Sequence, residues 1–187
     1  ELKRIGKYVF AHSSIQTISI PSKVEDIGAS WCFNANFLET VKIGPNNQNF
    51  IQNGPFTINK SENGNFDTIN LVNKNVILTK IPAFIRKIDS YSFTNCHKLK
   101  TVEFEKDSKL ELIGENAFES SSIIEVSIPP HVKSIKKYAF SDCASLESVT
   151  FSNDSKLRFI FTFAFYRTGI KEVIFPSSLV HIGAFAF

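Results

Sequence analysis

The stretch Ile135-Lys-Lys-Tyr-Ala-Phe-Ser-Asp-Cys-Ala-Ser-Leu-Glu-Ser-Val-Thr-Phe151 decides the fold, because its pattern recurs along the chain. It opens with an isoleucine, four further residues and a phenylalanine. The same motif begins at Ile5, Ile88, Ile113, Ile160 and Ile182, and a further copy at Ile27 has Cys32 in the phenylalanine position. Such a repeat predicts a solenoid, in which neighbouring copies stack and bury one continuous core.

A second motif follows five or six residues after each phenylalanine position, with apolar residues spaced as in Leu146, Val149 and Phe151. This alternation predicts a strand with one face inward, and copies in successive repeats should pair in parallel. The Gly-x-x-Ala-Phe segments are too short for a regular helix. We therefore expect an α/β repeat solenoid with a parallel concave β-sheet and short helical or 3₁₀ turns on the convex side.

One step between repeats is longer than the others. The lead isoleucines are 22 or 25 residues apart except between Ile27 and Ile88, which are 61 apart. This interval holds an asparagine-rich insertion at about residues 45–75, in which Phe56–Ile58 and Phe66–Leu71 flank the turn pair Asn63-Gly64. Asn-Gly between alternating apolar runs favours a β-hairpin. We expect one inserted β-hairpin that projects from the solenoid, with Phe66 as the lead position of a degenerate repeat.

The repeat resembles the BspA-type leucine-rich repeat family, whose units look like Ile-Gly-x-x-Ala-Phe-x-x-Cys-x-x-Leu-x-x-Val-x-Ile-Pro. The resemblance covers almost the whole chain apart from about residues 45–75; Cys32 in place of phenylalanine and Phe161 in place of glycine depart from it. It implies a surface protein of bacteria or protists that adheres to host or matrix proteins. The resemblance therefore suggests a cell-surface or secreted location.

We expect residues 1–187 to form a single leucine-rich-repeat domain of about seven to eight repeats. Both ends cut the pattern within a unit, since Leu2 begins inside one and Phe187 stops at a phenylalanine position. This predicts that the natural protein continues beyond these residues. Alternatively, the open repeat ends could pair with another copy, which would give self-association.

The composition argues against several classes of protein. Of the 187 residues, 43% are hydrophobic, and 21 Lys and Arg against 18 Asp and Glu leave a net charge of only +3. There is no basic run, so nucleic acid is disfavoured as a partner. The longest apolar run, Phe159–Tyr166, is far shorter than the roughly 20 residues of a transmembrane segment, and no signal peptide is recognisable.

No residues form a recognisable catalytic, cofactor or metal site. The histidines occupy different positions of the repeat, so no zinc site is expected. Cys96 and Cys143 lie in equivalent positions two repeats apart, which should place them about 10 Å from each other, beyond disulfide reach. We expect three free thiols, counting Cys32, and a protein that is not an enzyme.

The candidate binding residues are those that point outward from the predicted strands and those of the insertion. The outward set is Thr40, Lys42, Lys80, Thr101, Glu103, Glu125, Ser127, Ser148, Thr150, Glu172 and Ile174. The insertion contributes Asn53, Phe56, Asn63 and Asn65, and Asn59 and Asn153 begin Asn-x-Ser triplets that can be glycosylated in a secreted protein. This small, polar surface of mixed charge suits hydrogen-bonded recognition of a protein or a glycan.

Our leading hypothesis is a non-enzymatic protein-recognition module that acts in cell-surface adhesion by binding a host or extracellular-matrix protein. The first alternative is a structural or self-assembly repeat module. A second is an intracellular scaffold or regulatory subunit, which three unpaired cysteines favour mildly, so that an intracellular location stays open.

Overall fold

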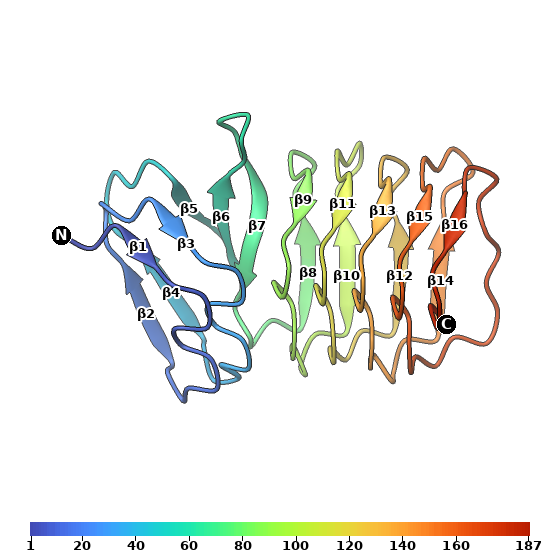
Figure 1. Cartoon of the computed structure of the whole chain (residues 1–187), viewed down its shortest axis with the longest axis horizontal. Coiled ribbons are helices and arrows are strands. Elements are labelled where there is room, and N and C mark those ends of the chain that lie inside the picture. The colour runs from blue at the N-terminus through green and yellow to red at the C-terminus, as the bar shows by residue number, and fades with distance from the viewer.

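The computed structural model describes residues 1–187 as a solenoid of sixteen β-strands without any α- or 3₁₀-helix. Figure 1 shows the coils in a row from the N-terminus to the C-terminus, with the strands of successive coils side by side. The prediction of a parallel repeat solenoid is confirmed. The expected helical or 3₁₀ turns are wrong, for a reason given below.

All coils except the last carry two kinds of strand. The long strands come from the alternating motif and are β2 (Thr17–Ile20), β4 (Thr40–Ile43), β8 (Leu78–Ile81), β10 (Thr101–Phe104), β12 (Glu125–Ile128) and β14 (Ser148–Phe151). The short strands end on the lead isoleucines and are β1 (Arg4–Ile5), β3 (Asp26–Ile27), β9 (Lys87–Ile88), β11 (Leu112–Ile113), β13 (Ser134–Ile135), β15 (Phe159–Ile160) and β16 (His181–Ile182).

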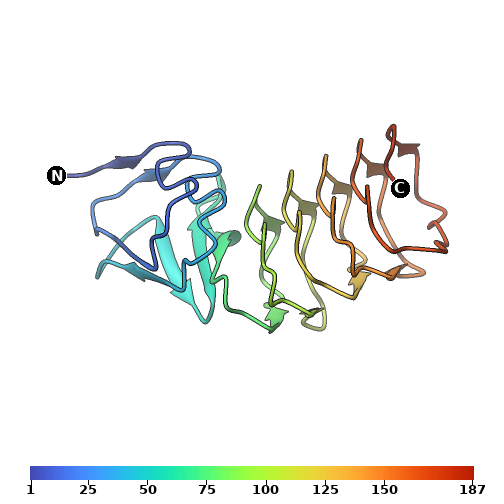
Figure 2. The ribbon, with the colours of Figure 1, turned by 90° about the horizontal axis from the view of Figure 1, so that it is seen from below.

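The strands form two rows of parallel sheet rather than the single sheet that the sequence predicts. Long strands build one row, in which β2 pairs with β4 and the order β14-β12-β10-β8 forms a second sheet. Short strands build the other row, in which β1 pairs with β3, and β9, β11, β13, β15 and β16 belong to an eight-stranded sheet. Figure 2 shows these two rows on different sides of the coils.

Left-handed residues explain why the Gly-x-x-Ala-Phe segments are not helical. The third residue after each lead isoleucine has a positive φ, for example 57° at Tyr138 and 59° at Phe163, and in six coils so does the residue four positions later. A left-handed residue interrupts a right-handed helix. The N–H groups between them donate to the next coil instead: Phe140 N to Ala164 O at 2.7 Å and Phe118 N to Ala139 O at 2.7 Å.

The core is a column of stacked side chains that splits into two clusters. Phe93, Phe118, Phe140 and Phe165 are fully buried and stack with ring centroids 4.5 to 5.0 Å apart. They belong to a cluster of 30 buried residues, whereas the N-terminal coils form a separate cluster of 12 around Trp31. In the N-terminal cluster Trp31 fills the alanine position and Cys32 the phenylalanine position, so that a large residue compensates for its small neighbour.

The insertion is part of the solenoid rather than a projection from it. It forms three antiparallel strands, β5 (Phe50–Asn53), β6 (Phe56–Lys60) and β7 (Phe66–Val72), of which the sequence predicts only the last two. β7 also pairs in parallel with β9, and Ile69 lies opposite Ile88. Ile69 is therefore the lead position, and the expectation of Phe66 there is wrong. Only the turn at residues 61–65 extends beyond the neighbouring coils in Figure 1.

The last repeat also departs from the prediction. Ile170, Val173 and Phe175 occupy the strand positions of their unit, yet residues 167–180 form no strand. The row of long strands consequently ends at β14, which leaves Ile174 81% exposed.

Candidate functional site

The outward side of the long-strand sheet carries a hollow of about 830 Å³, which we call the strand groove. Its floor and sides come from β8, β10, β12 and β14 and from the loops that follow β10, β12 and β14. Along each strand the inward residues are buried and the outward ones exposed, as in β12, where Val126 is buried and Ser127 exposed. The alternation that builds the core therefore also presents a row of polar side chains to this groove.

The groove lies over a place where two strands separate. β8 and β10 pair over four residues, as do β12 and β14, but β10 and β12 pair only at Thr101 and Glu125. After β10, Glu105 N donates to Ile81 O of β8 at 3.0 Å, and after β4, Gly44 N donates to Ile20 O of β2 at 2.7 Å. Pro129 holds the equivalent position after β12 and has no N–H to donate to Phe104 O. One hydrogen bond that could join the ends of β10 and β12 is therefore missing beside the groove.

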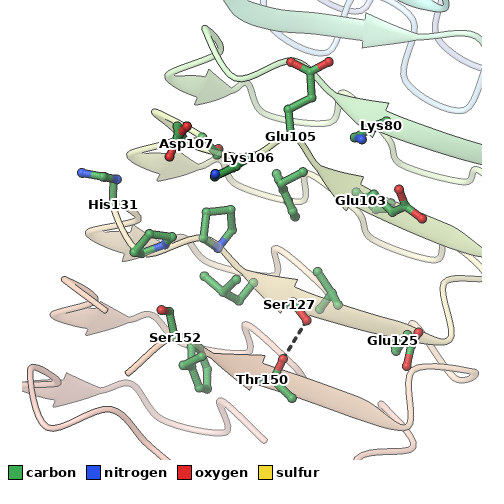
Figure 3. Close-up of a pocket in the computed structure, with 18 of the residues that line it drawn as sticks. Lys80, Glu103, Glu105, Lys106, Asp107, Glu125, Ser127, His131, Thr150 and Ser152 are labelled. Carbon is green, nitrogen blue, oxygen red and sulfur yellow. Dashed lines mark hydrogen bonds between the residues drawn. The ribbon is translucent and has the colours of Figure 1, made fainter. Parts of the chain in front are cut away.

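Six of the predicted outward residues line this groove, and five do not. The lining residues are Lys80, Thr101, Glu103, Glu125, Ser127 and Thr150. Among them Ser127 Oγ and Thr150 Oγ1 form a hydrogen bond of 2.8 Å (Figure 3). The five residues outside the groove are Ser148 at the start of β14, Thr40 and Lys42 on β4 in the separate N-terminal sheet, and Glu172 and Ile174 in the final segment without a strand.

The loops add groove residues that sequence reasoning missed. They include Glu105, Lys106, Asp107, His131, Ser152 and Asp154. Figure 3 shows Asp107, Lys106 and His131 at the loop end of the groove and Glu103 and Glu125 at the opposite end. The repeat pattern could have predicted these residues, because the loops that follow paired parallel strands meet at one edge of a sheet.

Acidic side chains dominate the groove although the chain as a whole is basic. Its carboxylates are Glu103, Glu105, Asp107, Glu125 and Asp154, against the ammonium groups of Lys80 and Lys106. None of these seven groups takes part in any of the six salt bridges of the structure. A hydrogen bond from Ser152 Oγ lowers the pKa of the Asp154 carboxyl.

The insertion offers a smaller surface than the sequence suggests. Asn53, Asn63 and Asn65 are exposed, but Phe56 is only 2% exposed and packs against Phe93 at a centroid distance of 6.3 Å. Of the two possible glycosylation positions, Asn153 is exposed, whereas Asn59 is half-buried and its Oδ1 lies in the interior without a hydrogen-bond partner. We therefore leave Phe56 out of the candidate contacts.

The groups most often used as metal ligands or nucleophiles are dispersed or buried in this structure. No three His, Cys, Asp or Glu side chains converge in a way that could hold a metal ion. All three cysteines are free and buried, as predicted. Burial raises the pKa of Cys32 to about 12 and that of Cys143 to about 11, so both thiols stay protonated and unreactive at neutral pH. The structure contains no helix that is long and apolar enough to cross a membrane.

Several solved structures resemble this one. The pneumococcal vaccine antigen PcpA is 18% identical, with a TM-score of 0.66, and the match covers 95% of this chain and 53% of PcpA. A leucine-rich repeat protein from Bacteroides ovatus is 22% identical, with a TM-score of 0.62, and the match covers 98% of this chain and 49% of that one. A leucine rich cell surface protein from Faecalibacterium prausnitzii is 19% identical, with a TM-score of 0.51, and the match covers 81% of this chain and 52% of that one. At these identities the likeness shows the fold alone. The chain spans about half the length of each of the three.

A comparison with curated proteins gives no match. The model of the BspA type leucine rich repeat region, in contrast, matches six copies over residues 1–77 and 71–187, which together span the whole chain. The stacked coils, the parallel sheets and this match agree with one another: the chain belongs to the BspA-type leucine-rich repeat family.

Proposed function

We propose that this chain is a non-enzymatic recognition module that binds a host or extracellular-matrix protein at a cell surface, and that the strand groove is its contact site. The observation that carries the proposal is a hollow of about 830 Å³ lined by exposed polar side chains from four strands of a rigid repeat scaffold. Binding residues held on regular strands keep their positions, which lowers the entropy cost of association.

A surface location is supported by two similar structures, one of a cell surface protein and the other of a vaccine antigen. These descriptions belong to the other two proteins, and the shared fold is the link to this chain. Recognition of a protein fits the groove because its polar groups are numerous and spread over about four strands, as in the wet, hydrogen-bonded rims of protein interfaces.

The test is binding of the purified chain to a panel of immobilised extracellular-matrix proteins and glycans. The groove variant is Ser127→Arg with Thr150→Arg, which fills the groove with two long side chains at exposed positions. The matched control is Ser19→Arg, at an exposed position of β2 in the separate N-terminal sheet. We expect saturable binding that the groove variant loses and the control keeps.

A result in which the groove variant and the control bind equally well would contradict the proposed contact site. The insertion is then examined with Asn63→Ala and Asn65→Ala, which change only the exposed turn. Replacing all of residues 46–75 is unsuitable, because β7 supplies buried residues to both core clusters.

A further inference from the structure

We infer that the strand groove selects a lysine- or arginine-rich segment of its partner, bound in an extended conformation. This inference rests on the proposed function and adds the chemistry of the segment that is recognised. It starts from the charge of the groove, in which five carboxylates face two ammonium groups. The chain carries a net charge of +3, so the acidic character belongs to this surface and does not reflect the composition.

Three of the five carboxylates lack partners within the chain. Glu105 accepts a hydrogen bond from Ala83 N at 2.9 Å and Asp154 accepts one from Ser152, but no hydrogen bond or salt bridge reaches Glu103, Asp107 or Glu125. Elsewhere on the chain some carboxylates are paired: Glu111, for example, bridges Arg86 and Lys133. Three carboxylates that stay unpaired around one hollow are available to an incoming cation.

The spacing of the carboxylates favours a chain of cations over a single ion. Glu103 and Glu125 lie at one end of the groove and Asp107 at the other (Figure 3), and no three of these groups converge as metal ligands do. A peptide in extended conformation repeats its side chains on one face about every 7 Å, so that several lysines can reach separate carboxylates.

The lining of the groove is partly apolar. Half-buried Phe104, Phe151 and Pro130 belong to it, and the two phenylalanine side chains also pack against the core. The apolar stems of lysines can cover these residues while their ammonium groups reach the carboxylates. Long-range attraction between the acidic rim and a basic segment also speeds association, and salt weakens it.

The probe is a fluorescein-labelled peptide of ten residues in which lysine alternates with valine, and anisotropy measures its dissociation constant. The comparison peptide has glutamate in place of every lysine. The groove variant Glu103→Gln with Glu125→Gln removes two charges without changing shape. The control Glu62→Gln with Glu147→Gln removes two exposed charges outside the groove. We expect the groove variant to weaken binding of the basic peptide by about tenfold and the control to leave it unchanged.

Three results would overturn the inference: no binding of the basic peptide, equal binding of the acidic peptide, or equal weakening by both variants. Each is distinguishable from failure of the proposed function. If the Ser127→Arg, Thr150→Arg variant still loses the matrix protein while the basic peptide does not bind, the groove remains the contact site and only the charge preference is wrong. If the basic peptide competes with the matrix protein for the wild-type chain, both proposals stand.

Discussion

Single residues set the chemistry of this protein by where they are buried. The three thiols lie inside the coils, and Cys32 shows the consequence most clearly, because desolvation raises its pKa from 9.0 to about 12 although the charge of Lys74 lowers it. The same burial applies to Cys96, whose pKa is also raised by desolvation. Buried, protonated thiols pack as small apolar groups rather than reacting.

A pH dependence of stability follows from Cys32. The folded state holds the thiol proton more tightly than the unfolded state, so this contribution is complete below pH 9 and is lost as the pH rises toward 12. Urea unfolding at pH 8 and pH 10 should therefore show wild type losing about 1 kcal/mol more than Cys32→Ala over this interval. An equal loss in the two proteins would show that the Cys32 thiol does not couple to folding.

The left-handed residues of the repeat could not be predicted from the sequence. The isoleucine–phenylalanine motif predicts a turn at the right place, but the left-handed residues inside it are mostly Tyr, Phe, Ser, Asn and Asp rather than glycine. Tyrosine and phenylalanine give no local signal for a positive φ. Contacts between coils accompany that conformation, namely the backbone hydrogen bonds and the stacking of Tyr138 on Phe163 and of Phe163 on Phe185. A single repeat contains none of these contacts, which is why its sequence wrongly predicts a helical turn.

Among the elements, the two strands of the predicted hairpin, β6 and β7, are present, but they lie within the solenoid and do not project from it. The Asn63-Gly64 turn correctly indicates the hairpin, and Gly64 has a φ of 77°. The sequence does not reveal that β7 completes the row of short strands, because its pairing with β9 joins residues of different motifs. The sequence also does not reveal that β10 and β12 pair only at Thr101 and Glu125, because both strands carry the same alternating motif as their fully paired neighbours.

The buried role of β7 gives a stability prediction. Ile69→Ala empties a fully buried position opposite Ile88 and should cost about 2–5 kcal/mol in free energy of unfolding. Asn65→Ala in the exposed turn of the same hairpin is the matched control and should change that free energy by less than about 0.5 kcal/mol. Urea titrations followed by circular dichroism provide the comparison. If Ile69→Ala were as harmless as the control, the insertion would not be part of the core.

At the scale of the whole molecule, the solenoid consists of two cores joined by the insertion. Neither sheet of the N-terminal coils continues into the sheets that follow. Across the boundary, Trp31 Nε1 donates to Asn70 Oδ1 at 3.0 Å and Lys74 N donates to Leu38 O at 3.1 Å. In a repeat protein, stability is a sum over neighbouring coils, so the smaller cluster should be the weaker one.

Trp31 makes this division measurable, because it is the one tryptophan and lies in the smaller cluster. Urea should change tryptophan fluorescence at a lower concentration than it changes the circular dichroism of the whole chain. Leu38→Ala should lower the urea concentration of the fluorescence transition alone. Phe140→Ala should mainly lower that of the circular dichroism transition. Coincident transitions in wild type and in both variants would instead indicate a single cooperative unit.

Recognition through the strand groove should be visible in the complex itself. Hydrogen–deuterium exchange is measured on the chain alone and with the matrix protein of the panel that binds it most tightly. We expect slower exchange at residues 101–108, 125–131 and 148–154 in the complex and unchanged exchange along the short strands. Protection confined to the hairpin turn at residues 61–65, to the short strands or to the final coil would contradict it.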